Sequence, residues 1–266
     1  MWTLVGYALL KFALFGLCFV MLLAAVLTWV ERKQSALIQD RIGPARANIG
    51  PIRLFGLLHL AADGIKSFVK EDFVPDTPNP TIFKLAPLLG FTPALVMFAV
   101  IPFGPGDTLV ISNVSFGMLF IFAISSLSVY SATLAGWASN SGWAMLGALR
   151  AAAQMISYEV SMGLSLIGVF MVYESVNLQQ VIVGQGDYFF GFIPAWGIVT
   201  QPLAFVLFLT AGIAETKRAP FDMPEGESEL VAGYFTEYSA MRFAMFPLSE
   251  FIGIVGVASV MAVLFL

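Results

Sequence analysis

The sequence predicts an all-α, polytopic membrane protein. Its 266 residues are 59% hydrophobic and only 11% charged, and the mean hydropathy is +0.87. A water-soluble chain of this length needs far more polar surface to cover its core. Several apolar runs exceed the roughly 20 residues with which an α-helix crosses a bilayer. A closed β-barrel would require short alternating strands instead, and we find no such pattern in the sequence.

About six transmembrane helices are expected. The first apolar run is too long for the core of a signal peptide and lacks a cleavage site of small residues, so we expect a retained membrane helix. The last run reaches the end of the sequence without a polar flank, which suggests a truncated sequence. The expected spans are residues 4–30, 81–103, 114–136, 148–173, 196–214 and 238–266.

A long polar stretch separates the first two expected spans. Within it, residues 52–70 alternate apolar and charged positions at helical spacing, which predicts an amphipathic helix in the membrane interface. Pro75, Pro78 and Pro80 then end this helix and return the chain to the membrane. We expect a single integral membrane domain over residues 1–266, with a cytoplasmic or interfacial segment at 31–80 and an acid-rich cytoplasmic loop at 215–237.

The basic residues predict the orientation. Of the 13 lysines and arginines, all except Lys11 lie in or beside the first, third and fifth connections. Because basic connections stay on the cytoplasmic side, we expect the N-terminus outside and the odd-numbered loops in the cytoplasm. The residues on that side are Arg32, Lys33, Arg41, Arg46, Arg53, Lys66, Lys70, Lys84, Arg150, Lys217, Arg218 and Arg242.

The sequence offers no redox centre of its own. Its one cysteine, Cys18, lies in the first span, and its one histidine, His59, is expected to be an interfacial residue without a metal. No cluster of cysteines or histidines could bind zinc, an iron–sulfur centre or haem, and no glycine-rich nucleotide motif is found. We therefore expect no metal and no covalent cofactor, so that a partner would supply the electrons of any redox reaction.

Three glutamates fall within or at the edge of expected spans, namely Glu159, Glu215 and Glu250. A charge at the centre of a bilayer costs about 2.5–3.5 kcal/mol, so these side chains must face protein or water. One interpretation is a protonated acid that is hydrogen-bonded inside the bundle. We favour a proton-relay site, because a desolvated carboxyl can take up and release protons near neutral pH. Gln154 and Tyr158 are spaced to hydrogen-bond within such a relay.

The fifth connection is acidic, although it belongs to the side on which the basic residues gather. A solvated loop would explain the charge, but it would not need the rigid Pro220, Pro224 and Gly226 or the apolar residues that follow. The pattern therefore favours a packed loop whose acids lie close enough to couple their titrations. The acids of this stretch are Glu215, Asp222, Glu225, Glu227 and Glu229, and Glu237 follows.

Charges of both signs also cluster after the first span. Glu31, Arg32 and Lys33 lie at the membrane face, and Asp63 and Lys66 are three residues apart on the interfacial helix, so that they can form an ion pair. Contacts with anionic lipid would explain the basic residues. They would not explain the acids, so a docking surface for a partner or the mouth of a ligand site is an equal alternative.

Five segments of the sequence together resemble one family. The chain is similar over essentially its whole length to the quinone-channel subunit (the H-subunit of bacteria, subunit 1 in mitochondria) of proton-pumping NADH:quinone oxidoreductase, respiratory complex I. The run at 215–238 is the most specific of the segments. They are ERK with QDRIGP at 31–33 and 39–44, ADGIK at 62–66, GWASNS at 136–141, LRAAAQMISYE at 149–159, and residues 215–238.

The resemblance implies a membrane subunit that forms the tunnel and chamber through which ubiquinone or menaquinone, the substrate, reaches the terminal iron–sulfur cluster. That cluster belongs to a peripheral-arm subunit, so the implied partners are this subunit, small neighbouring membrane subunits and lipids, with no nucleic acid. The implied location is a bacterial inner membrane or the mitochondrial inner membrane. The residues that match tunnel positions are Glu31, Arg32, Asp63 and Lys66. Those that match the acidic path toward the pumping subunits are Glu159, Glu215, Asp222, Glu225, Glu227, Glu229 and Glu250.

The chain departs from the family pattern in a few places. Gly142 stands where the family often has Lys, Lys217 where it often has Asn, and Phe251 where it often has Tyr, and His-Leu-Ala at 59–61 replaces a common Gln-Pro-Leu. These departures concern details of quinone access and docking. The family usually has eight spans and this chain offers six, so either two spans are missing from the sequence or the subunit is shortened.

Other functions remain open on the sequence. The equivalent subunit of a membrane-bound hydrogenase or a formate hydrogenlyase would keep the fold without a quinone, although the intact acidic run at 225–229 favours complex I. An independent proton-coupled transporter and a passive membrane anchor are alternatives of other classes. Quinone reduction that changes the charge near the acidic loop, with coupled carboxylates passing the change into the membrane, is the mechanism we expect.

Overall fold

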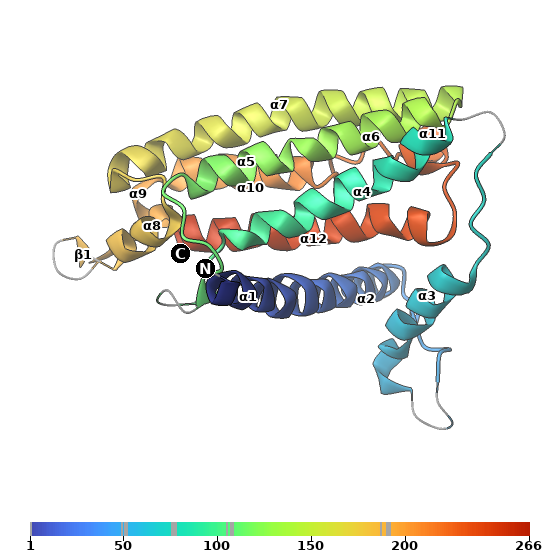
Figure 1. Cartoon of the computed structure of the whole chain (residues 1–266), viewed down its shortest axis with the longest axis horizontal. Helices are drawn as coiled ribbons and strands as arrows, with labels where there is room; N and C mark the ends of the chain where they lie inside the picture. Colours follow the sequence, from blue (N-terminus) through green and yellow to red (C-terminus); the bar gives the residue numbers. More distant parts are fainter. Residues whose placement is uncertain are drawn as a thin grey trace.

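The computed structural model describes residues 2–48, 50, 53–75, 79–104, 106, 109–186, 188–189 and 193–266. Within these residues the fold is a bundle of long helices, which confirms the predicted all-α membrane class (Figure 1). The bundle is built by helices that pack in pairs: α4 (Pro80–Val96) packs with α6 (Leu127–Ala138) and α12 (Ala240–Phe265). In turn, α6 packs with α7 (Gly142–Tyr173), and α7 packs with α10 (Pro202–Glu215). Helix α5 (Gly117–Ser125) precedes α6.

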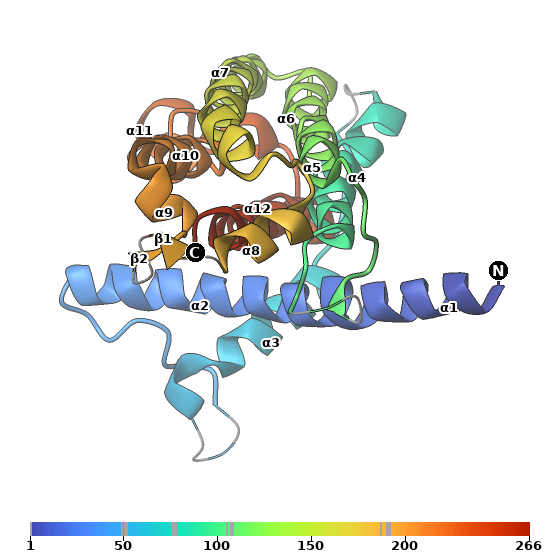
Figure 2. The same ribbon diagram turned by 90° about the vertical axis from the view of Figure 1, so that its left-hand side faces the viewer.

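The first helix is long and crosses the rest of the bundle at a steep angle (Figure 2). It consists of α1 (Trp2–Lys11), a π-helical stretch η1 (Phe12–Phe19) and α2 (Val20–Ile38), which follow one another without a break. Many of its apolar side chains are exposed, as expected for a helix that faces lipid. Because the helix continues to Ile38, eight residues beyond the end of the expected span, Glu31, Arg32 and Lys33 lie on a helix and not in a loop.

The amphipathic helix is confirmed, but it is shorter than predicted. A short 3-10 turn, η2 (Leu54–Gly56), precedes α3 (Leu58–Val69), whereas the expected helix began at residue 52, which is outside the described residues, as is Pro78. Gly56 explains the late start: its φ is +92° and a Cβ there would lie 2.0 Å from the Pro44 carbonyl oxygen, so the chain turns tightly before the helix begins. Apolar Ile65 and Phe68 of α3 are exposed.

Five helical stretches of the described chain are long and apolar enough to cross a membrane, not six. The expected span at 196–214 is divided into α9 (Gly197–Thr200) and α10, because Gln201 leaves the helical region at φ −136° and ψ +61° and Pro202 has no N–H to continue the hydrogen bonding. With 14 residues, α10 is only about 21 Å long at about 1.5 Å per residue, short of the roughly 30 Å of a hydrocarbon core.

The remaining described elements are short. A hairpin of two-residue strands, β1 (Tyr188–Phe189) and β2 (Ile193–Pro194), pairs antiparallel in the connection that precedes α9. It is the only strand pairing among the described residues and leaves the all-α class unchanged. The other elements are η3 (Met97–Ala99), α8 (Leu178–Gln185), α11 (Glu227–Leu230) and η5 (Gly233–Phe235).

Small residues allow the helices to approach one another closely. A Cβ on Gly136 of α6 would lie 2.4 Å from Cβ of Ala148 on α7, so only glycine fits this crossing. On the neighbouring face of α6, Ser131 donates a hydrogen bond of 2.7 Å to the Ala86 carbonyl of α4. These contacts fix α4, α6 and α7 side by side, and the acidic connection packs at their common end.

The connections that carry most basic residues lie at one end of the molecule. Figure 1 places the end of α2, α3, the turn between α6 and α7, and the connection between α10 and α12 at this end, and it places both chain termini at the other. The acid-rich stretch and the charged end of α2, which are far apart in the sequence, are therefore neighbours in space.

Candidate functional site

The connection from α10 to α12 is folded against the bundle. Tyr234 and Leu230 are almost fully buried, and the rings of Phe83 and Tyr238 stack with their centroids 4.0 Å apart. Gln154 of α7 secures the connection, because its amide donates to the Phe221 carbonyl at 2.7 Å and to the Ala214 carbonyl at 2.8 Å. The stretch is thus packed, as its proline, glycine and apolar residues indicated.

Three side chains form a closed ring of hydrogen bonds at the centre of the site. The Lys217 ammonium donates to the Tyr234 hydroxyl at 2.6 Å and to Oε1 of Glu250 at 3.0 Å. The Tyr234 hydroxyl in turn donates to the same Glu250 oxygen at 3.0 Å. Only 6% of the Lys217 side chain and 10% of the Glu250 side chain are exposed. The ion pair is therefore sequestered from solvent, where an unpaired charge would be costly.

Glu225 brings a second carboxyl to this ring. Its carboxyl lies within hydrogen-bonding reach of the Glu250 carboxyl, and Asp222 is near enough to act on it electrostatically. Burial, and after it the negative charge of Glu250, raise the pKa of Glu225 to about 9. Its Oε1 is buried and makes no hydrogen bond within the described part of the chain. At neutral pH the Glu225 carboxyl therefore carries a proton.

Glu215, the last residue of α10, lies beside the ring. Its Oε2 is buried and has no hydrogen-bond partner among the described residues. The carboxyl of Glu159 on α7 and the ammonium of Lys217 are close enough to interact with it electrostatically. Within the described part of the chain, Gln154 and Tyr158 make contacts other than the predicted relay hydrogen bonds. Gln154 donates to backbone carbonyls, and the Tyr158 ring packs on Phe221 with centroids 5.4 Å apart.

Arg218 connects this buried group with the end of the first helix. Its guanidinium donates to Oε1 of Glu31 at 2.8 Å and lies 4.0 Å from Oε2 of Glu250. It also lies over the Phe251 ring, 4.4 Å from the centroid. A single arginine thus stands between a carboxylate expected at the tunnel and a carboxylate expected in the acidic path.

The other expected tunnel residues lie between α2 and α3. Arg32 of α2 forms an ion pair with Asp63 of α3, and both side chains are about half exposed. The predicted pairing of Asp63 with Lys66 is wrong, because the tertiary packing of α3 against α2 offers Asp63 a guanidinium that is better placed than the lysine on its own helix. Lys66 is exposed and makes no ion pair among the described residues.

The remaining acids are spread over the surface of the loop. Glu229 of α11 pairs with Arg150 of α7 at 2.6 Å, and 64% of its side chain is exposed. Asp222 is exposed as well. Glu227 begins α11, and its side chain is outside the described residues. The structure therefore gathers Glu215, Glu225 and Glu250 and leaves Glu229 apart from them.

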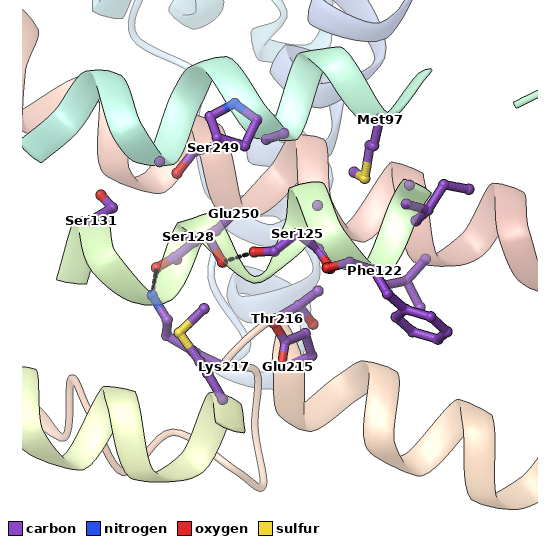
Figure 3. A pocket seen from close by; sticks show the side chains of 18 of the residues that line it. Met97, Phe122, Ser125, Ser128, Ser131, Glu215, Thr216, Lys217, Ser249 and Glu250 are labelled. Atoms are coloured by element: carbon purple, nitrogen blue, oxygen red, sulfur yellow. Dashed lines mark hydrogen bonds and ion pairs between the residues drawn. The ribbon is translucent and has the colours of Figure 1, made fainter. Parts of the chain in front are cut away.

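A cavity of about 100 Å³ opens beside the ring (Figure 3). Since one water needs about 10–15 Å³ of such space, several waters fit. Its walls are mostly apolar, and none of the four expected tunnel residues lines it. Figure 3 shows Lys217 and Glu250 pointing toward each other at its edge, with Glu215 beside them. The polar lining consists of Glu215, Thr216, Lys217, Tyr234 and Glu250 with four serines, Ser125, Ser128, Ser131 and Ser249.

Sequence reasoning missed the cations of the site. Lys217 and Arg218 served to predict the orientation, and Lys217 was noted as a departure from the family pattern, but neither was expected at the site. Tyr234 was counted among the apolar residues of the acidic loop. A lysine and an arginine two and three residues after a glutamate at the end of an apolar run were the available signal. Among the described residues, no group of three or more His, Cys, Asp or Glu is arranged to hold a metal ion.

Comparisons with known proteins identify the family. A family model described as NADH dehydrogenase matches residues 10–266. The H-subunit 2 of the NADH-quinone oxidoreductase of Syntrophobacter fumaroxidans is 45% identical over 272 residues, which cover 100% of this chain and 78% of the relative. The chain belongs to the H-subunit family of NADH-quinone oxidoreductase.

Two further members of this family are about equally similar. The H-subunit 2 from Rhizobium meliloti is 43% identical, with 98% of this chain and 77% of the relative covered. The H-subunit from Thermomicrobium roseum is 46% identical, with 99% and 76% covered. The predicted family is thus confirmed. As a member of it, the chain is a membrane-located part of a quinone-using, multi-subunit enzyme, and other subunits of that enzyme are its partners.

Proposed function

We propose that the chain forms the quinone access tunnel and chamber of its enzyme and the first part of an acidic path that couples quinone reduction to proton translocation. The observation that carries this proposal is the position of Arg218 between Glu31 and Glu250. A change of charge near Glu31 acts on the buried carboxyls through this guanidinium, because Coulomb interactions are strong where water is excluded.

The tunnel side of the proposal rests on the end of α2 and on α3. Glu31, Arg32, Asp63 and Lys66 are its residues, and the Arg32–Asp63 ion pair joins the two helices. Exposed Ile65 and Phe68 on the amphipathic α3 give an apolar surface on which a lipophilic ligand can move from the bilayer. Charged groups beside this surface would orient a quinone head group.

The acidic path is proposed to begin at the buried carboxyls. Contact between the carboxyls of Glu225 and Glu250 supports it, because two acids that share one proton titrate as a pair and respond to a nearby charge. The unpaired Oε2 of Glu215, beside a cavity with room for water, offers the next position for a proton. The proposed members of the path are Glu159, Glu215, Asp222, Glu225, Glu227, Glu229 and Glu250.

In this proposal the subunit takes no part in electron transfer. The absence of redox ligands from its sequence agrees with electrons that arrive from a peripheral-arm subunit carrying the terminal iron–sulfur cluster. Small membrane subunits would receive the protons or the charge movement. The proposed orientation has the N-terminus outside and the ends of α2, α6 and α10 at the cytoplasmic face, where the basic residues lie.

A photoreactive quinone analogue tests the tunnel in the assembled enzyme. We expect labelled peptides from the end of α2 and from α3, with the labelling suppressed by excess quinone. Asp63→Asn should raise the KM for quinone several-fold, whereas Asp40→Asn, on the exposed turn after α2, is the matched control. Specific labelling of other subunits alone, with an unchanged KM in Asp63→Asn, would contradict the proposed tunnel.

A further inference from the structure

Lys217 is a buried cation inside a group of acids. It lies two residues after the end of α10, adopts the left-handed backbone region with φ +52°, and is only 8% exposed. The position is one at which the chain departs from the pattern of the family described above. Moving an ammonium out of water costs several kcal/mol unless charges and hydrogen bonds compensate it, so the contacts of Lys217 define its role.

The contacts of the Lys217 ammonium are with Glu250 and with Tyr234, which itself binds Glu250. The ammonium lies 3.0 Å from Oε1 of Glu250 and 2.6 Å from the Tyr234 hydroxyl, and it lies over the Tyr234 ring at 4.5 Å from the centroid. Tyr234 donates its own proton to the same Glu250 oxygen. Oε1 of Glu250 thus accepts two hydrogen bonds, one of them from a cation, an environment that suits a carboxylate and leaves no place for a proton on that oxygen.

We propose that Lys217 is a positioning residue for proton transfer: its ammonium keeps Glu250 ionised and fixed against Tyr234, so that the proton of the Glu225–Glu250 pair resides on Glu225. The inference rests on the proposed function of these carboxyls in an acidic path, and it names the residue that decides which of them carries the proton.

The surroundings of the pair agree with this division of roles. Burial, and then the adjacent charge of Glu250, raise the pKa of Glu225 to about 9. Burial also raises the pKa of Tyr234, so its hydroxyl stays neutral and able to donate. Arg218 is the only other cation near Glu250 in the described part of the chain, and at 4.0 Å it is shared with Glu31. The charged or titratable groups that face the pair are Lys217, Arg218, Asp222 and Tyr234, and Glu215 lines the same cavity as Glu250.

The cavity beside the ring has the ionised Glu250 and Glu215 in its wall. Lys217, Tyr234 and Glu250 all line it, and Glu215 lies at the same wall. With the ammonium in place, Glu250 is held as the fixed charge of the pair, and Glu225 and Glu215 are left as the groups that exchange protons. Without it, the unshared charge of Glu250 would be buried, and protonation of Glu250 would relieve the cost.

Infrared difference spectra of the purified, assembled enzyme test the proposal through the carbonyl band of protonated carboxyl groups. At pH 7, Lys217→Met should gain one protonated carboxyl per subunit relative to the unmutated enzyme. This gain should be absent in Lys217→Arg, which keeps the charge, and in the double variant Lys217→Met/Glu250→Gln. Lys84→Met, at an exposed lysine of α4, is the matched control. A spectrum of Lys217→Met identical to that of the unmutated enzyme would overturn the proposal.

Glu250→Gln decides the question even if Lys217→Met fails to assemble. The measurement is made at pH 5, where burial keeps Glu225 protonated without the adjacent charge of Glu250. An ionised Glu250 contributes nothing to the band, so its replacement should leave the intensity unchanged, whereas the loss of one carboxyl would refute the assignment. These spectra do not depend on pumping. Failure of the acidic path would appear instead as unchanged proton translocation in Glu225→Gln, with the effect of Lys217→Met on the band still present.

Discussion

The guanidinium of Arg218 donates to the Glu31 carboxylate at 2.8 Å, although the two residues are 187 positions apart in the sequence. The contact fastens the end of the first helix to the connection between α10 and α12. Because Arg218 also faces Glu250 at 4.0 Å, it joins the two groups of residues on which the proposed function depends.

Replacing Arg218 with lysine should therefore uncouple the two groups. A lysine keeps the charge, but its ammonium cannot face two carboxylates in a plane or stack on the Phe251 ring as a guanidinium does. We expect quinone-dependent turnover of the assembled enzyme to fall by roughly tenfold, the equivalent of about 1.4 kcal/mol. Arg53→Lys, at an exposed arginine before η2, serves as the control. Full turnover in Arg218→Lys would show that the bridge is dispensable.

Gln154 should be important for stability. Its amide donates to two backbone carbonyls, Ala214 at the end of α10 and Phe221 in the acidic loop. Gln154→Met would remove both hydrogen bonds and would leave the Ala214 carbonyl only its backbone donors. The expected loss is about 2 kcal/mol, or roughly 4–8 °C in the midpoint of thermal inactivation. Gln34→Met, at an exposed position of α2, should leave the midpoint in place. Equal midpoints for the two variants would exclude the structural role of these hydrogen bonds.

Gly233 should not accept a side chain. Its φ is +60°, and a Cβ would lie 2.2 Å from the Pro224 carbonyl oxygen, so alanine must push the loop away from Tyr234. We expect Gly233→Ala to destabilise the subunit by about 2 kcal/mol or more and to lower its amount in the assembled enzyme. Gly142→Ala, where the Cβ meets nothing within 4 Å, is the matched comparison and should assemble normally.

Glu225 should make stability depend on pH. Its pKa is raised from 4.5 to about 9, so between these values the unfolded chain has lost a proton that the folded chain retains. Its contribution to the free energy of unfolding is complete below pH 4.5 and declines as the pH rises toward 9. Glu225→Gln should remove this decline and stabilise the protein at pH 7 by on the order of 3 kcal/mol. The midpoints of thermal inactivation at pH 5 and pH 8, compared between the unmutated protein and Glu225→Gln, measure this decline. An unchanged pH dependence in Glu225→Gln would refute the contribution of Glu225.

Composition and hydrophobic runs were sufficient to predict the class and five of the spans, because lipid requires long apolar helices. The expected span at 196–214 is instead divided into α9 and α10, since hydropathy does not register the break at Gln201 and Pro202. Spacing along α3 suggested Lys66 as the partner of Asp63, but the packing of α3 on α2 brings Arg32 to Asp63 instead. Local spacing cannot reveal such contacts.

The acids of the site could be recognised from the sequence, whereas their partners could not. Glu215 and Glu250 stand out as charges in apolar runs. Lys217 and Tyr234 reach Glu250 only because the loop folds back over the ends of α7 and α12, across 33 and 16 positions. The protonation state of each carboxyl depends on this fold. A neighbouring ammonium favours the ionised form of an acid, whereas a neighbouring carboxylate favours its protonated form.

Proton translocation per quinone reduced, measured in vesicles that contain the assembled enzyme, tests the central claim most directly. Glu225→Gln and Glu215→Gln should lower this ratio or abolish turnover, while Glu174→Gln, at the exposed end of α7, should leave both unchanged. An unaltered ratio at full turnover in both variants of the buried acids would contradict the claim that these carboxyls carry the coupling protons.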